Sequence, residues 1–175
     1  MVYYCNAPGY KQDIGAYISV DEKMEKQKKN PEELLRSGKP IVISPSGYSM
    51  YPLIVPGRDK VMIVPVTMKK PENHDIVLFR REGSILVIHR VVKIRRAADG
   101  TRLFYIVGDN QKEIEGPVKE SQICGTVTGI IRKGKKIKTS DPLYRSLVSI
   151  WVLLRPVRPV ISRLAAKVKR AVKRG

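Results

Sequence analysis

The chain has little cysteine and little histidine. Its two cysteines, Cys5 and Cys124, lie far apart, and neither belongs to a CxxC or other metal-ligand spacing. Because His74 and His89 are the only histidines, the sequence argues against a zinc site. Two isolated cysteines also suit a reducing compartment.

Long apolar runs are missing as well. A membrane-spanning helix needs roughly 20 apolar residues, and the nearest candidate, residues 147–154, is too short and ends at Arg155. The first seventeen residues hold no apolar run and include Lys11 and Asp13, which is not the pattern of a secretory signal peptide. The sequence therefore predicts a chain with no export signal and no spanning anchor.

Acidic residues are scarce. The 175 residues contain 34 lysines and arginines against 16 acids, which gives a net charge of +18. Such a chain is attracted to nucleic acid or to anionic lipid, and the charge alone does not decide between them. The hydrophobic fraction of 42% is typical of a globular protein.

Composition divides the chain into three regions. Residues 1–30 form a polar N-terminal extension in which Met24 is a second candidate start. Residues 31–140 form the main domain, and it opens with a short helix because Asn30 suits the cap position and Pro31 the first helical position. Residues 141–175 form a basic C-terminal region.

The main domain is predicted to be mainly all-β. Its runs rich in Val and Ile are separated by tight turns, without intervening helices. Asp99 and Gly100 form a strong hairpin signal, which should join a strand at 91–95 to one at 102–107. The other predicted strands are residues 61–64, 75–79, 84–94 and 122–131.

The C-terminal region is predicted to be helical and amphipathic. Apolar residues recur at helical spacing in two groups, Leu147, Ile150, Trp151 and Leu154, then Ile161, Leu164, Val168 and Val172. Basic residues surround the second group, and no acid follows Asp141. This pattern favours an anionic membrane surface as partner. The alternative is a helix packed on the domain with a solvated basic face.

Three short motifs within the β region can carry chemistry. Residues 46–52 read Ser-Gly-Tyr-Ser-Met-Tyr-Pro, so Ser49 stands in a glycine-containing turn that can expose its hydroxyl. His89 lies in the apolar strand, where a general base could serve that serine, and His74 in a polar turn is the weaker candidate. Gly108-Asp109-Asn110 follows the next strand. Taken singly, each motif also suits a plain turn or a satisfied buried histidine.

In this order, the three motifs resemble type I signal peptidases and the related LexA-type self-cleaving proteases, over residues 41–131. Residues 49–52 match the Ser-Met-x-Pro box, and 108–110 match the Gly-Asp-Asn box. The segment holding His89 resembles the box with the general base, in the Ser–His variety. The resemblance implies a complex β fold of the signal peptidase and LexA kind, with a short N-terminal helix and a basic helical C-terminal tail.

The resemblance also implies roles for single residues. Ser49 is the expected nucleophile and His89 the base, while Asp109 and Glu115 are both candidates for the supporting acid. The oxyanion or substrate-binding residues are expected at Ser46, Gly47 and Met50. No metal or organic cofactor is implied.

The predicted function is that of a serine endopeptidase that cleaves precursor or leader peptides after small residues. The alternatives are a LexA-like transcriptional regulator or nucleic-acid-binding protein of the same fold, and a non-catalytic scaffold. We expect no nucleic-acid partner, because the basic tail has no groove-reading motif. The protein is expected at the cytoplasmic membrane as a peripheral protein, with a purely cytoplasmic location as the alternative.

Overall fold

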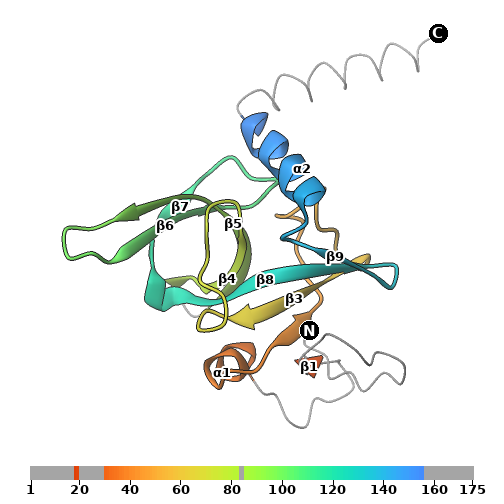
Figure 1. The fold of residues 1–175 in the computed structure, drawn as a ribbon, viewed down its shortest axis with the longest axis horizontal. Coiled ribbons are helices and arrows are strands. Elements are labelled where there is room, and N and C mark those ends of the chain that lie inside the picture. Colours follow the sequence, from red (N-terminus) through yellow and green to blue (C-terminus); the bar gives the residue numbers. More distant parts are fainter. Residues whose placement is uncertain (1–17, 20–29, 83–84, 156–175) are drawn as a thin grey trace.

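The computed structural model describes residues 18–19, 30–82 and 85–155, and its framework is one mainly antiparallel β-sheet (Figure 1). This confirms the prediction of a mainly all-β chain. In the described part, the elements in chain order are β1 (Ile18–Ser19), α1 (Pro31–Arg36), β2 (Ile41–Ile43), β3 (Asp59–Pro65), β4 (Ile76–Arg80), β5 (Leu86–Arg96), β6 (Arg102–Val107), β7 (Glu115–Lys119), η3 (Glu120–Gln122), β8 (Ile123–Arg132), β9 (Lys135–Lys138) and α2 (Pro142–Leu153).

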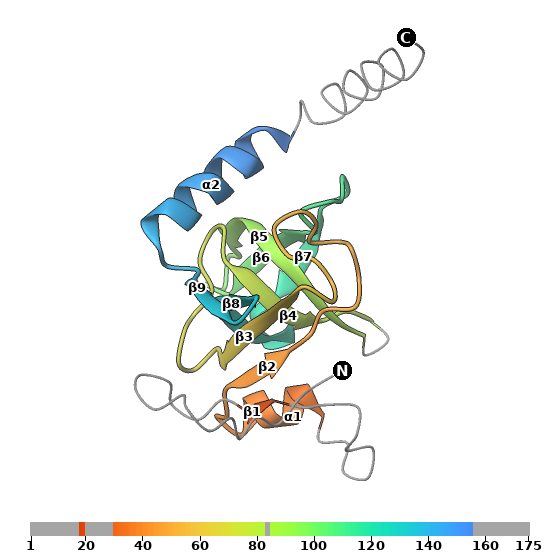
Figure 2. The same ribbon diagram turned by 90° about the vertical axis from the view of Figure 1, so that its right-hand side faces the viewer.

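The sheet is curled, and its strand order is β1-β2-β3-β8-β4-β5-β6-β7, with β9 paired to β8 (Figure 2). Strand β8 comes late in the chain but lies between β3 and β4. The two-residue β1 pairs with β2 in parallel. Most of the predicted polar extension at residues 1–30 lies outside the described residues.

The predicted N-terminal helix is confirmed as α1. The Asn30 side chain accepts a hydrogen bond from the backbone N–H of Glu32 at 3.0 Å, and Pro31 takes the first helical position. Leu34 and Leu35 are buried, so one side of this helix closes the end of the core next to β2 and β8.

The predicted Asp-Gly hairpin is also confirmed. Strands β5 and β6 are antiparallel and paired from Arg96 opposite Arg102 to Arg90 opposite Val107. The Asp99 side chain accepts a hydrogen bond from the backbone N–H of Thr101 at 2.9 Å. Gly100 has a φ of +82°, a conformation that glycine adopts without steric cost. This turn fixes the register of the long strand that carries His89.

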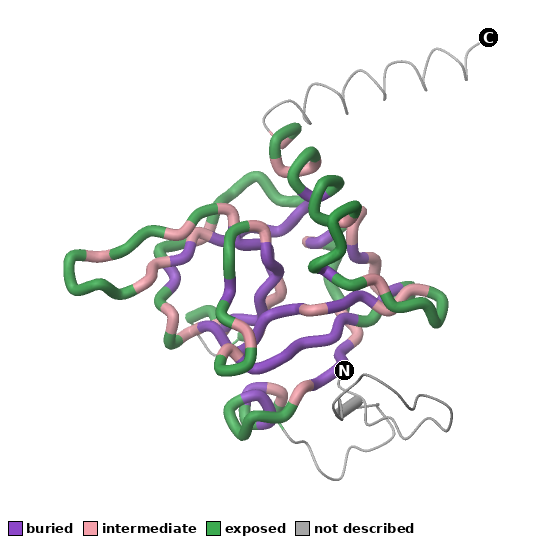
Figure 3. Tube along the Cα trace, viewed as in Figure 1, coloured by how far each residue is buried: buried purple, intermediate pink, exposed green. Residues whose placement is uncertain are grey.

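The core lies on both faces of the sheet, and β4 shows this most directly. Ile76 and Leu78 join one buried cluster, together with side chains of α1, β2, β3 and β8. Val77 and Phe79 join a second cluster with Phe104, from β6. Alternation along a strand therefore supplies both clusters. Figure 3 shows the continuous buried strands in the middle of the molecule.

Helix α2 follows the sheet, and it confirms the first of the two predicted C-terminal helices. The Asp141 side chain accepts hydrogen bonds from the backbone N–H groups of Leu143 and Tyr144, at 2.9 and 3.3 Å. The second predicted helix, with Ile161 and Val172, lies outside the described residues. No helix within residues 30–82 and 85–155 is long and apolar enough to cross a membrane.

Candidate active site

Ser49 stands in a turn between β2 and β3. The backbone N–H of Tyr51 donates to the Tyr48 carbonyl at 3.1 Å, and that of Ile54 donates to the Met50 carbonyl at 2.9 Å. Ser49 itself is half-buried, between an exposed Tyr48 and a Met50 that is only 2% exposed. The buried Met50 side chain packs in the core cluster and anchors this turn, while Ser46 and Gly47 are exposed.

The Gly108–Asn110 segment lies directly against the backbone of Ser49. The N–H of Asn110 donates to the Ser49 carbonyl at 2.7 Å. A Cβ atom at Gly108 would come within 2.7 Å of that same carbonyl oxygen, closer than real side chains approach. Glycine is therefore required at this position for the two loops to meet, although they are about 60 residues apart in the chain.

His89 reaches the same region from strand β5. Strands β5 and β6 pair Arg90 with Val107, the residue before Gly108, so His89 lies where β6 leads into the Gly108–Asn110 segment. The structure thus brings the strand of the predicted base beside the loop that holds the predicted nucleophile. Within the described residues, the Ser49 hydroxyl and the His89 ring make no direct hydrogen bond to each other.

The imidazole of His89 is 1% exposed and faces one carboxylate. Its Nδ1 atom lies 2.8 Å from Oε1 of Glu115, a close contact that does not meet the geometry of a hydrogen bond. The ring of Phe79 packs against it, with 6.1 Å between ring centroids. A carboxylate at Nδ1 leaves the Nε2 atom of the ring to accept a proton from another group.

Arg81 holds Glu115 from the other side. Its Nε and Nη2 atoms donate to the two carboxylate oxygens at 2.7 and 2.6 Å, the fork geometry that arginine makes with a carboxylate. Glu115 opens strand β7 and Arg81 follows strand β4, so the pair joins two strands that are not neighbours in the sheet. Arg81 therefore fixes the carboxylate that faces His89.

The environment lowers the pKa of His89 below its ordinary value. Burial is the largest cause, because it disfavours the charged imidazolium, and the positive charge of Arg81 acts in the same direction. The carboxylates of Glu115 and Asp109 oppose this shift. The result is a ring that is neutral at pH 7 and able to accept a proton.

Asp109, the other candidate acid, is bound by a different partner. Its carboxylate accepts two hydrogen bonds of 2.7 Å from the Arg90 guanidinium, and both residues are buried. Burial alone would lower the pKa of Arg90, but the hydrogen bonds and the charge of Asp109 more than reverse this and raise it. Arg90 also donates to the His74 carbonyl at 2.8 Å. Asp109 thus fixes the loop as part of a buried ion pair.

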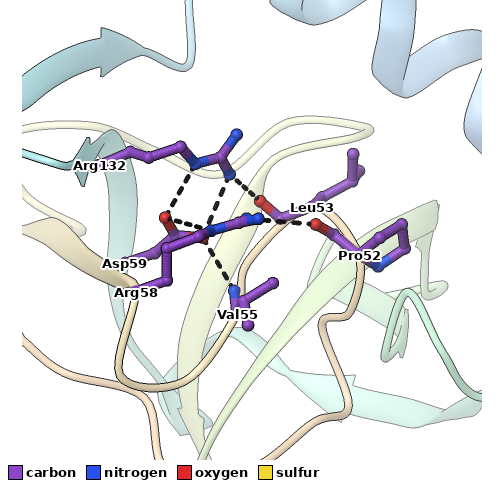
Figure 4. Close-up of polar contacts among 6 residues, drawn as sticks. All are labelled: Pro52, Leu53, Val55, Arg58, Asp59 and Arg132. Atoms are coloured by element: carbon purple, nitrogen blue, oxygen red, sulfur yellow. Dashed lines mark hydrogen bonds and ion pairs between the residues drawn. The ribbon is translucent and has the colours of Figure 1, made fainter.

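A second ion-pair cluster holds the chain that follows Ser49 (Figure 4). Asp59 is 1% exposed and pairs with Arg58 at 2.7 Å and with Arg132 at 2.8 Å. The same two arginines donate to the carbonyls of Pro52, at 3.4 Å, and Leu53, at 2.8 Å. The cluster therefore fixes the segment that begins three residues after the predicted nucleophile.

Asp59 is ionised at all ordinary pH values. Burial on its own would raise its pKa, but the hydrogen bonds from Arg58, Arg132 and the Val55 N–H outweigh burial and lower the pKa to about 2. The negative charge that the two arginines need is therefore permanent near neutrality.

His74 lies beside helix α2, and its backbone carbonyl accepts the hydrogen bond from Arg90. Its Nδ1 atom is 3.4 Å from the Ser149 hydroxyl. Its pKa is lowered by burial first and by the charges of Arg90 and Arg145. His74 has a φ of +70°, which marks a tight turn.

The sequence did not reveal Arg81, Arg90 and Asp59 as parts of this arrangement. Arg90 offered one signal, because it stands next to His89 with two apolar residues before the pair and two after it, at 87–88 and 91–92. Such a buried cation needs a carboxylate partner. In the described ranges, histidine, cysteine and acidic side chains form no cluster able to hold a metal ion. No protein-family model matches the chain, and a search of curated proteins gives no significant match.

Proposed function

We propose that the protein is a serine endopeptidase of the type I signal peptidase kind. The observation that supports this most strongly is the position of the Gly108–Asn110 segment. It binds the Ser49 backbone through Asn110, and it continues from strand β6, which pairs with the strand of His89. A nucleophile, a base and a loop that holds them together are what acyl transfer requires.

The reaction proceeds through an acyl-enzyme. His89 Nε2 takes the proton from the Ser49 hydroxyl as Oγ bonds to the carbonyl carbon of the peptide, and the oxyanion forms. When the C–N bond breaks, the protonated His89 gives its proton to the leaving amine. Water then attacks the Ser49 ester with His89 again as base, and the new carboxyl terminus leaves.

The remaining groups support these two residues. Glu115 at Nδ1 orients the imidazole and stabilises its charged form during the reaction. The backbone N–H of Ser49 and the exposed Ser46 and Gly47 are the candidate donors to the oxyanion. The substrate is an extended precursor or leader peptide with small residues before the cut, as the motif resemblance implies.

The test is cleavage of such a peptide by four proteins measured side by side. Ser49→Ala and His89→Ala should each lose at least about a thousandfold in kcat/KM, the usual loss when a member of such a unit is removed. His74→Asn is the matched control, because asparagine tolerates a positive φ and His74 lies beside α2, and it should cleave normally. Undiminished cleavage by Ser49→Ala contradicts the proposal.

A further inference from the structure

Helix α2 carries a row of apolar side chains that the domain does not cover. Leu143 is 71% exposed, Leu147 and Ile150 are each 54% exposed, and Leu154 is 39% exposed. Leu154 is the C-cap residue of α2, and because the four residues recur every three or four positions they lie along one side of the helix and its cap. We call them the outer row. Figure 3 shows the helix exposed along most of its length.

A different side of α2 fixes the helix to the domain. Val148 is 2% exposed, and Tyr144 packs against the core cluster below it. Just beyond the helix, the Arg155 guanidinium donates to the carbonyls of Gln111 and Lys112, at 3.1 and 2.8 Å. The packing of the domain therefore accounts for Tyr144 and Val148 but leaves the outer row unexplained.

The charged residues before and after the outer row in the chain are mainly basic, although the exposed Asp141 caps the start of α2. Just before α2, strand β9 and its turn expose Lys133, Lys135, Lys136 and Lys138. From Pro142 onward the sequence has no acid, and its basic residues include Arg145, Arg155, Arg158, Arg163, Lys167, Lys169, Arg170, Lys173 and Arg174. Apolar side chains beside many cations match the boundary between the acyl chains and the headgroups of an anionic membrane.

A second copy of this chain fits the outer row less well. Each copy carries a net charge of +18. In a dimer formed through the outer row, the basic C-terminal regions of the two copies would lie close to each other. Like charges brought together this way oppose association. An anionic lipid surface removes that repulsion and covers the apolar side chains at the same time.

We propose that α2 lies on an anionic lipid surface, with Leu143, Leu147, Ile150 and Leu154 inserted at the level of the headgroups. The inference goes beyond the proposed peptidase activity and does not depend on it. If both hold, Arg155 joins the bound helix to the segment whose Asn110 holds the Ser49 backbone. The candidate site would then work next to the membrane surface.

The test is co-sedimentation of the full chain with vesicles of phosphatidylcholine, alone or mixed with phosphatidylglycerol, at physiological salt. The wild type should bind the anionic vesicles at least about tenfold more tightly than the neutral ones. The double variant Leu147→Ser/Ile150→Ser should lose at least about tenfold of that binding, because it removes two inserted side chains. Leu143→Ser/Leu154→Ser should do the same and serves as an independent variant.

The matched control changes two apolar side chains of similar exposure outside α2. Met68 is 62% exposed and Ile85 is 58% exposed, so Met68→Ser/Ile85→Ser should bind the vesicles as the wild type does. The proposal is overturned if both outer-row variants stay folded and bind like the wild type. It is also overturned if the wild type does not bind anionic vesicles. A third contrary result is a dimer, seen by sedimentation equilibrium, that the outer-row substitutions dissociate while vesicle binding is unchanged. Binding requires no peptide, so this result is independent of cleavage.

Discussion

His89 Nδ1 lies 2.8 Å from the Glu115 carboxylate, while the next residue of the same strand, Arg90, binds Asp109. The two acids that the sequence left as alternatives therefore contact two different side chains. Glu115 faces the imidazole, and Asp109 neutralises a buried guanidinium. This difference predicts that their removal will have different consequences.

Asp109→Asn should destabilise the fold, because it leaves the Arg90 charge buried without a counter-charge. Breaking a buried pair from one side typically costs about 3 to 5 kcal/mol. Glu115→Gln should cost about 1 kcal/mol or less, because Glu115 and Arg81 are both partly exposed. Denaturant unfolding of both variants measures this contrast. Equal losses of stability would contradict the separate roles.

The pH dependence of cleavage should follow the ionisation of His89. The neutral ring is the active form, so kcat/KM should rise with pH through a midpoint below 6.5, since burial and Arg81 lower the pKa of His89. A midpoint above 7 would argue against His89 as the base.

Two substitutions should move this midpoint in opposite directions. Glu115→Gln removes a carboxylate that raises the pKa of His89, so the midpoint should fall. Arg81→Ala removes a cation that lowers it, so the midpoint should rise. Arg80→Ala is the control, because Arg80 pairs with Glu32 and not with Glu115. Shifts of the same sign in both variants would be inconsistent with this electrostatic account.

Gly108→Ala should reduce cleavage by moving the Ser49 turn. The added Cβ would lie 2.7 Å from the Ser49 carbonyl oxygen and also 2.7 Å from the Gln111 side chain. Because a backbone atom cannot rotate away, we expect kcat to fall at least about tenfold, as small misplacements of reacting groups are costly. Gly47→Ala meets nothing within 4 Å and provides the comparison for stability. A Gly108→Ala enzyme with full kcat would show that the contact does not position Ser49.

Asp59→Asn should destabilise the protein in a pH-dependent way. The pKa of Asp59 is lowered from 3.8 to about 2 in the fold, so its ionised form is worth about 2 kcal/mol near neutrality. This contribution is present above pH 4 and is lost as the pH falls through about 2. The difference in unfolding free energy between wild type and variant should therefore shrink between pH 6 and pH 2. If the difference in unfolding free energy stays constant over this pH range, the pKa of Asp59 is not lowered by the fold.

Local chemistry made several parts of the fold predictable from the sequence. The Asn30 cap and the Asp99–Gly100 turn each depend on residues close together in the chain. The contact between Asn110 and Ser49 was not predictable from local spacing, because it depends on how the sheet brings two distant loops together. The order of the motifs led us to expect a single site, but it did not predict this contact.

The pairing of charges was the least predictable part. Arg81 meets Glu115 across 34 positions, and Arg132 meets Asp59 across 73. In a chain with 34 basic residues, nothing local distinguishes the few that face a buried carboxylate. The helical spacing of α2 likewise predicted an apolar side but not which side packs on the domain.

A peptidase of this kind forms a covalent ester between Ser49 and its substrate by means of His89. Acid quenching of the protein during turnover of a peptide ester, followed by mass spectrometry of the digested chain, measures this directly. Covalent catalysis by Ser49 predicts the acyl mass on the peptide that contains Ser49 in the wild type, and its absence in His89→Ala. Turnover without any acyl group on Ser49, or an acyl group on another residue, would contradict it.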